Sequence, residues 1–149
     1  MAERTFATQL DEFKQTYHAL ITIAEQYPPT LYNQEGVCGE WSAREVLAHI
    51  NGWLVEAQRR YPRYARGTGN INYNVDSYNA VSLWLRENYP YEHILDETRQ
   101  LTDKMITMAR DIRDVHLERD TRYGEWLDIL SEHVITHNQE LQAFLDVNT

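Results

Sequence analysis

Apolar residues recur with the period of an α-helix along most of the chain. Between residues 5 and 26 they follow one another at alternating steps of four and three, which places them on one face of a helix. The same period returns in residues 42–61, 92–113 and 125–146, and no segment alternates with the period of two that strands show. The chain is therefore expected to form four long amphipathic helices. The stripe of the first helix consists of Phe6, Leu10, Phe13, Tyr17, Leu20 and Ala24.

Prolines, glycines and capping residues indicate where these helices begin and end. The pair Pro28–Pro29 ends the first helix, and Pro90 precedes the third. Ser42 and Glu45 have the spacing of a capping box, in which each side chain bonds the backbone amide of the other residue. The second helix is therefore expected to begin there. Gly124 is expected to lie in the loop before the last helix.

Residues 62–92 have the least regular pattern. Gly67, Gly69 and several nearby asparagines indicate a loop. Asp76 has the position of an N-cap for a short helix that extends to about Leu85. An irregular segment and a short helix are therefore expected between the second and third long helices.

Length and composition indicate one folded unit. A chain of 149 residues has the size of one domain, and 42% hydrophobic with 25% charged residues is typical of a globular protein. We therefore expect a single domain over residues 1–149, with an all-α, antiparallel four-helix bundle as its fold. Formation of a homodimer through an exposed helical face is compatible with this architecture.

The formal net charge of −9 indicates which classes of partner to expect. An acidic surface repels phosphate backbones, and no basic patch with interleaved aromatic residues offsets it, so nucleic acid is not expected as a partner. No apolar stretch reaches the about 20 residues that a membrane span needs. The first residues lack the basic and apolar regions of a signal peptide, and a single cysteine, Cys38, excludes an internal disulfide framework. A cytoplasmic protein without a membrane partner is therefore expected.

Three of the six histidines occupy positions on the apolar stripes. His133 and His137 lie four residues apart in the last helix, between Leu130 and Leu141, so both are expected to face the interior of the bundle. His49 replaces an apolar residue in the second helix in the same way. The other histidines lie off the stripes or outside the helices and are expected to be solvated: His18, His93 and His116.

Inward positions for His49, His133 and His137 indicate a shared ligand. An imidazole inside a core loses its hydration without compensation, and a metal ion would supply that compensation for all three. Neutral imidazole binds zinc, nickel, copper or iron. Three protein ligands leave a coordination position open, as in reactive rather than closed structural sites. The alternative is that each histidine is a hydrogen-bonded core residue.

Two segments of the chain resemble the DinB-like four-helix-bundle superfamily. The first runs from Glu40 to Trp53 and contains a Trp-Ser pair, an apolar turn and then His49. The second is the pair His133 and His137, separated by Val-Ile-Thr late in the last helix. The resemblance implies a bundle in which these three histidines bind a divalent metal ion, commonly zinc or nickel. Characterised members of the superfamily include thiol-dependent transferases and isomerases.

Residues 73–84, with their Tyr-Asn and Trp content, are most similar to the branch of that superfamily that contains the colibactin self-protection protein. The branch resembles hydrolases of a reactive cyclopropane, and its members need not keep the three histidines. This chain keeps all three.

Several other side chains are candidates for roles near the metal. Glu45, Asp128 and Glu132 lie close to the histidines in sequence and could orient an imidazole ring, although Glu45 is already assigned to the cap. Cys38 has no adjoining histidine or basic residue, so an inert, partly buried thiol is expected. The aromatic residues of the middle region either pack it onto the bundle or form a wall over the metal: Tyr61, Tyr64, Tyr73, Tyr78 and Trp84.

Three functional hypotheses follow from these residues. The first is a metal-dependent enzyme that acts on a small reactive molecule by hydrolysis or by thiol transfer. The second is a non-catalytic protein of the self-protection type that binds or sequesters a small molecule. The third is a structural role, in which the histidines stabilise the bundle. No catalytic residue is assigned beyond the metal ligands.

Overall fold

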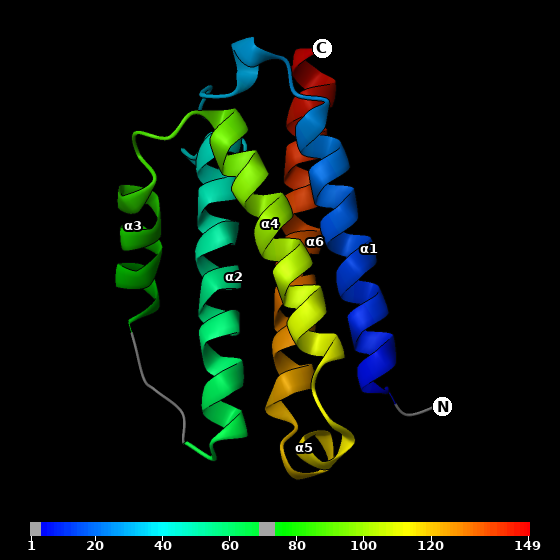
Figure 1. Cartoon of the computed structure of the whole chain (residues 1–149). Helices are drawn as coiled ribbons and strands as arrows, with labels where there is room; N and C mark the ends of the chain where they lie inside the picture. Colours follow the sequence, from blue (N-terminus) through cyan, green and yellow to red (C-terminus); the bar gives the residue numbers. More distant parts are fainter. Residues whose placement is uncertain (1–3, 69–73) are drawn as a thin grey trace.

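The computed structural model describes residues 4–68 and 74–149, and these residues form helices connected by loops (Figure 1). The predicted all-α four-helix bundle is confirmed, and no strand occurs within these ranges. None of the described helices is both long and apolar enough to cross a membrane. The long helices are α1 (Phe6–Glu25), α2 (Ala43–Ala65), α4 (Tyr91–Arg110) and α6 (Arg122–Asn148); the shorter ones are η1 (Pro29–Leu31), α3 (Val75–Leu85) and α5 (Asp114–Arg119).

The long helices run as two pairs in opposite directions. In Figure 1, α1 and α6 ascend from the end that carries the N-terminus, whereas α2 and α4 descend toward it. The helix α3 makes this order possible, because it returns the chain to the upper end after α2 and lies outside the bundle against that helix. The core is therefore built from the four long helices, with α3 beside α2 on the outside.

Apolar stripes of the long helices form the core as the periodicity predicts. On α1 the stripe positions from Leu10 to Ala24 are buried, and on α4 Ile94 and Met105 are fully buried. Burial of each such side chain stabilises the fold by roughly 1.5–3 kcal/mol. On α6 the core side chains include Leu127, Leu130, Val134 and Leu141, which flank the two histidines of that helix.

Four details of the predicted boundaries are wrong. The helix α2 continues to Ala65 with Pro62 inside it, and α3 is capped by Asn74, whose Oδ1 accepts from the amide of Ser77, rather than by Asp76. The short helix α5 was not predicted.

The fourth wrong boundary concerns the start of α6. This helix begins at Arg122, so Gly124 lies within its first turns and not in the preceding loop. A β-carbon at Gly124 would overlap the side chain of Gln9 on α1. The overlapped atoms are the amide end of the flexible Gln9 side chain, which can move aside. The glycine is therefore tolerated inside the helix despite its usual preference for turns.

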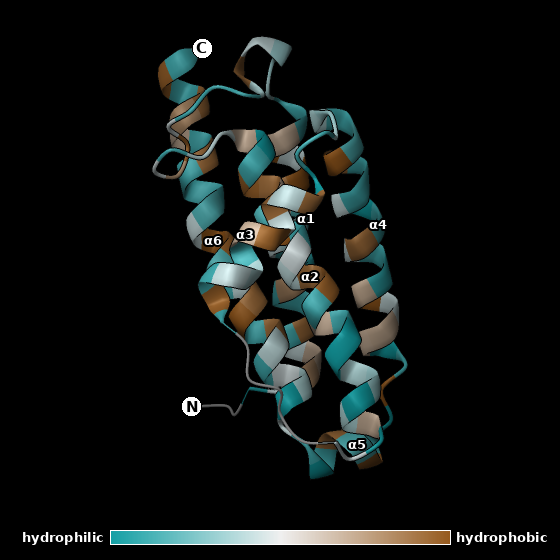
Figure 2. Cartoon of the chain, turned by 90° about the vertical axis from the view of Figure 1, so that its left-hand side faces the viewer, coloured by the Kyte–Doolittle hydropathy of each residue, from teal (hydrophilic) through white to brown (hydrophobic). Residues whose placement is uncertain are grey.

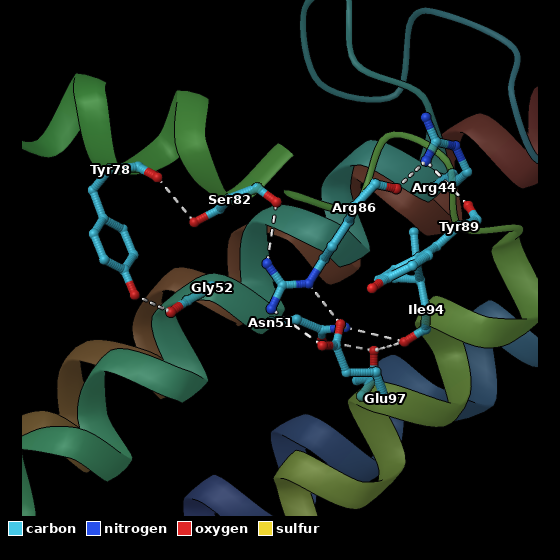
Figure 3. A network of polar contacts seen from close by, with 10 residues as sticks. Arg44, Asn51, Gly52, Tyr78, Ser82, Arg86, Tyr89, Ile94 and Glu97 are labelled. Atoms are coloured by element: carbon cyan, nitrogen blue, oxygen red, sulfur yellow. Dashed lines mark hydrogen bonds and ion pairs between the residues drawn. The ribbon is translucent and has the colours of Figure 1, made fainter. Parts of the chain in front are cut away.

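The helix α3 is attached to α2 through hydrogen bonds and through the contact of the Tyr78 ring with Trp53. The hydroxyl of Tyr78 donates to the carbonyl of Gly52 at 2.7 Å (Figure 3). A β-carbon at Gly52 would overlap the side chain of Ser82, so the missing side chain lets the two backbones approach closely. The outward face of α3, which is turned to the viewer in Figure 2, is instead apolar, with Trp84 65% and Leu85 57% exposed.

A polar network connects α2, the end of α3 and α4 (Figure 3). The guanidinium of Arg86 donates to Glu97 at 2.6 Å, and the Nδ2 of Asn51 donates to Glu97 at 2.8 Å and to the carbonyl of Ile94 at 3.0 Å. Arg44 donates to the carbonyl of Arg86 at 3.0 Å. The network fixes the C-terminal end of α3 relative to the bundle.

Candidate metal centre

The three histidines predicted from the stripes meet inside the bundle. His49 extends from the second turn of α2, and His133 and His137 extend from successive turns of α6. The Nε2 of His133 lies 2.9 Å from the Nε2 of His49 and 2.9 Å from that of His137. The three donor nitrogens all lie within 4.8 Å of one another. This group, which we call the histidine triad, could hold a metal ion.

The start of α2 determines where His49 lies. The predicted capping box is present: the Oγ of Ser42 accepts from the amide of Glu45, and the carboxylate of Glu45 accepts from the amide of Ser42, both at 3.2 Å. The cap fixes the first turn of the helix, and His49 follows one turn later. Trp41, just before the cap, packs its ring 4.7 Å from the His49 ring.

Burial keeps the triad uncharged. It lowers the pKa of His49 to about 3 and that of His133 to about 4, with a smaller contribution from the neighbouring imidazoles. Burial also lowers the pKa of His137, but Glu140 opposes this shift. All three rings are therefore neutral near pH 7, which is the form of imidazole that binds metal ions.

The contact between His137 and Glu140 sets the proton positions in the triad. The Nδ1 of His137 lies 2.8 Å from the Oε1 of Glu140. A carboxylate can only accept, so Nδ1 carries the proton and the Nε2 of His137 presents a lone pair to His133. Carboxylates commonly hold metal-binding histidines in this way.

Hydrogen bonds alone do not satisfy the triad. The Nε2 of His133 faces the Nε2 of His49 on one side and that of His137 on the other, each at 2.9 Å. A ring nitrogen either donates one proton or accepts one, so it can form a hydrogen bond with only one of these two neighbours. The Nδ1 of His49 is also buried without a hydrogen-bond partner among the described residues. A cation shared by the three Nε2 atoms would remove the conflict, since zinc–nitrogen bonds of about 2.0–2.1 Å fit within such a group. The donor set therefore fits a divalent metal.

The triad lines a cavity of about 770 Å³ between α2, α3 and α6. Its walls are largely apolar, and three of the four tryptophans contribute to them. Two of these indoles are fixed by hydrogen bonds: Trp53 donates to the Oδ1 of Asn79 at 2.8 Å, and Trp126 donates to the hydroxyl of Tyr64 at 2.8 Å. The lining residues are Cys38, Trp41, His49, Trp53, Val75, Asn79, Trp126, Ile129, Leu130, His133, Thr136, His137 and Glu140.

The aromatic wall is therefore built from residues other than those proposed from the sequence. Tyr61 is buried in the core, where its hydroxyl donates to the carbonyl of Tyr123, and Tyr78 packs behind Trp53 with ring centroids 4.7 Å apart. Trp84 is exposed on the outer face of α3. Tyr64 supports Trp126 from behind, and Tyr73 lies outside the described residues.

The carboxylates proposed as supports for the histidines are also the wrong ones. Glu45 is engaged in the cap, Asp128 accepts from Arg4 at 2.6 Å and from Gln9 at 2.8 Å, and Glu132 is exposed. Glu140 takes the role instead. Its spacing of three residues after His137 is the signal that could have identified it, because residues three apart share a helix face.

Cys38 lies beside this carboxylate at the edge of the cavity. Its sulfur, a ring nitrogen of His137 and an oxygen of Glu140 lie within 4.8 Å of one another. Burial, together with the adjacent Glu140, raises the pKa of the Cys38 thiol to about 11. The thiol is therefore protonated near pH 7, in line with the inert, partly buried cysteine expected from the sequence.

Comparison with known proteins gives structural neighbours but no sequence relatives. No family model matches the chain, and no curated protein matches its sequence. The structure is similar to a crystal structure of an uncharacterised protein from Escherichia coli UTI89, with a TM-score of 0.82 and 16% identity over 99% of this chain and 96% of that one. It is also similar to the crystal structure of the colibactin self-resistance protein ClbS in complex with double-stranded DNA, with a TM-score of 0.78 and 12% identity over 98% of each chain.

The chain has a ClbS-like fold. At these identities the likeness establishes the fold alone. It agrees with the branch of the superfamily suggested by residues 73–84, whereas the superfamily name itself has no further support from the comparisons.

The ClbS complex corrects one prediction. Nucleic acid was excluded as a partner because of the net charge of −9, but a protein of this fold has been crystallised with double-stranded DNA. The exclusion was wrong because net charge sums the whole surface, whereas phosphate contacts depend on local charge. Residues 57–75 show the difference, since they contain four arginines and no acidic residue.

Proposed function

We propose that this protein is a metal-dependent enzyme that acts on a small reactive molecule, with zinc or nickel bound by His49, His133 and His137. The observation that carries the proposal is the convergence of three neutral Nε2 atoms, with two contacts of 2.9 Å, on the wall of a 770 Å³ cavity. Three ligands leave a coordination position for a substrate or a nucleophile. The site thus combines a reactive centre with space for an organic molecule.

The protein groups around this centre have separable roles. A bound divalent ion would supply Lewis acidity, which favours hydrolysis of an electrophile or its capture by a thiol. Glu140 holds the proton on the Nδ1 of His137 and thereby keeps the Nε2 lone pair in place. Trp41 and Trp126 exclude water from the cavity wall, which strengthens electrostatic interactions with the substrate.

Metal analysis of the purified protein tests the proposal. We expect about one zinc or nickel ion per chain, and loss of that ion in the His49→Ala, His133→Ala and His137→Ala variants. Titration of the metal-free protein with Ni²⁺ should quench the tryptophan fluorescence, because the Trp41 ring lies 4.7 Å from the His49 ring. His93→Ala, which removes an exposed histidine, is the control and should bind metal normally. Metal content that is unchanged in all three triad variants would refute the site.

A second candidate is a non-catalytic protein that sequesters a small molecule. It is favoured by the apolar cavity and by the ClbS-like fold, because ClbS is a self-resistance protein. Stoichiometric binding of a ligand that persists after metal removal, without formation of a product, would support this role. Turnover that is lost with the metal would support the enzyme instead. A large loss of stability on chelation with neither binding nor turnover would indicate a structural role for the triad.

Binding of duplex DNA is a third candidate, and one feature of the chain favours it. The C-terminal half of α2 carries Arg59 and Arg63, Arg66 follows directly after the helix, and residues 57–75 contain no acidic residue. Arg59 and Arg66 are exposed. Binding measured at several salt concentrations should weaken in a triple Arg→Gln variant, with a reduced salt slope. Lys104→Gln, which changes an exposed cation on α4, is the matched control.

A further inference from the structure

Two polar side chains of the cavity wall are already engaged within the site. Asn79 accepts from the indole of Trp53 at 2.8 Å, and its side chain also interacts with the ring of His49. Glu140 holds the Nδ1 proton of His137. No lysine or arginine is among the described residues that line the cavity. A carboxylate or phosphate on the body of a ligand would therefore lose its hydration there without gaining a cationic partner.

The apolar part of the wall continues from the interior to the surface. Three tryptophans and Leu130 line the cavity. Val75 on α3 and Ile129 on α6 line it too, although each is more than half exposed. Single exposed apolar residues are common on protein surfaces, but these two belong to the wall of one cavity. We call them the cavity lip, and they extend the apolar surface from the histidine triad to solvent.

The position of the lip shows where the cavity opens. Both α3 and α6 pack against α2, but within the described ranges they scarcely contact each other. Figure 2 looks onto this side of the molecule, with α3 in front of α2 and α6 to its left. Val75 begins α3, and Ile129 lies two turns into α6. The cavity therefore has an exit between these two helices.

The size of the cavity agrees with a ligand that uses this exit. Its volume of about 770 Å³ lies in the range that organic ligands of drug size occupy. A small polar molecule at the triad would leave most of the apolar wall in contact with water. A molecule with a long apolar body would cover the wall and the lip together, and burial of that surface favours binding.

We infer that the substrate is an elongated, uncharged molecule, whose reacting end reaches the histidine triad and whose apolar body leaves the cavity over Val75 and Ile129. Its chemical class is an alkyl or alkyl-aryl compound with a small reactive head. This inference rests on the proposed function of the triad, because that function defines which end of the ligand reacts. Recognition of the apolar body nevertheless takes place away from the triad, and it can be measured without turnover.

Straight-chain alcohols of increasing length test the inference by calorimetry. Butan-1-ol, hexan-1-ol, octan-1-ol and decan-1-ol share a polar head and differ only in the apolar chain. We expect each added methylene group to tighten binding about three- to fourfold up to decan-1-ol, because the chain stays in contact with the apolar wall as it passes the lip. A gain that stops at hexan-1-ol, or failure of all four alcohols to bind, would overturn the inference.

An ether of the same length tests the apolar character of the path. Diethylene glycol monobutyl ether matches decan-1-ol in length but carries two ether oxygens in its chain. It should bind at least roughly tenfold more weakly than decan-1-ol, because these oxygens lose their hydration against the wall. Equal affinities of the two compounds would show that the chain lies in solvent and would contradict the assignment.

A matched pair of double variants locates the exit. The lip variant carries Val75→Ser and Ile129→Ser, and the control carries Val81→Ser and Ile135→Ser, at exposed positions of the same helices that do not line the cavity. Val75 and Val81 are 52% and 50% exposed, so the exchanges on α3 are comparable. The lip variant should lose roughly tenfold in affinity for decan-1-ol and keep the affinity for butan-1-ol, whereas the control should bind both as the wild type does.

Equal losses in the lip variant and the control would overturn the exit between α3 and α6. So would a loss for butan-1-ol as large as that for decan-1-ol, because the short alcohol does not reach the lip. Failure of the proposed function would appear separately, as absence of bound metal or of turnover with the dependence on chain length intact.

Discussion

The Oε1 of Glu140 lies 2.8 Å from the Nδ1 of His137, three residues earlier on α6. This pair explains how a neutral histidine with its Nδ1 protonated presents a lone pair at Nε2. Glu140 also lies beside Cys38, with its oxygen and the Cys38 sulfur within 4.8 Å of each other. One acidic side chain therefore influences both the histidine triad and the single thiol of the chain.

Loss of that carboxylate should weaken metal binding. We expect Glu140→Ala to lower the affinity for Zn²⁺ by about 10- to 100-fold, because the His137 ring loses the acceptor that orients it. Glu140→Gln retains an acceptor oxygen and should have a smaller effect. Competition with a chromogenic chelator measures both affinities, and Glu132→Ala, at an exposed position on the same helix, should leave the affinity unchanged. Equal affinities of wild type and Glu140→Ala would contradict this role.

The free energy of unfolding of the metal-free protein should decrease as the pH falls below 6.5. Burial lowers the pKa of His49 to about 3 and that of His133 to about 4, whereas free histidine titrates near 6.5. At pH values between the folded-state and unfolded-state pKa, the unfolded chain binds more protons than the folded one. The stability that comes from keeping these histidines neutral is therefore complete above pH 6.5 and is lost as the pH decreases toward 4. Each such histidine adds a slope of up to about 1.4 kcal/mol per pH unit.

Urea unfolding of the metal-free protein at several pH values measures that slope. The variant His133→Leu keeps the stripe apolar and removes one titrating ring, so its free energy of unfolding should depend less steeply on pH than that of the wild type. His18→Leu, at an exposed position, serves as the control. Parallel pH profiles for wild type and His133→Leu would show that the ring is not buried in neutral form.

A side chain at position 52 should displace α3. In Gly52→Ala the added methyl group would overlap Ser82, and we expect a loss of about 1–3 kcal/mol of stability. Ser82→Gly removes the obstructing atoms at a helix-propensity cost of about 1 kcal/mol. The double variant should therefore be more stable than the sum of the single changes implies, and chemical denaturation of the four proteins measures this coupling. Strict additivity would show that the two residues are not in contact.

The ion pair of Arg86 and Glu97 should matter more than the exposed pairs. Arg86 is 8% exposed, and its loss removes the cation from the Glu97 carboxylate, which keeps the hydrogen bond from Asn51. We expect Arg86→Met to destabilise the protein by about 3 kcal/mol. Arg99→Met, which removes a half-exposed pair with Asp96, should cost at most about 1 kcal/mol. Similar costs for the two variants would refute the structural importance of the network.

Periodicity identified the long helices and the triad for the same physical reason. A histidine on an apolar stripe must face the core once the stripe packs, so His49, His133 and His137 could be located without coordinates. The contribution of Glu140 could not be seen, because many polar residues of α6 lie three or four positions from a histidine. The packing of α6 against α1 and α2 shows which of these polar residues lies next to the His137 ring.

Misplaced boundaries have a different origin. Gly124 has the turn preference of any glycine, yet it lies within the first turns of α6, which begins at Arg122. The tryptophans of the cavity lie on long helices or just before one, where they resemble ordinary core residues. The aromatic residues of the middle region attracted attention because they lie in an irregular segment, yet Trp84 points to solvent.

The polar attachment of α3 affects how this protein can change over evolutionary time. The hydrogen bonds from Tyr78 to Gly52 and from Trp53 to Asn79, with the close approach of Ser82 to Gly52, determine where the helix lies. Its outward positions are therefore free to vary without altering the interior. Substitutions at Val81, Trp84 or Leu85 can therefore accumulate independently of ligand choice. Variation along this short helix is thus expected to concentrate on the side that faces solvent.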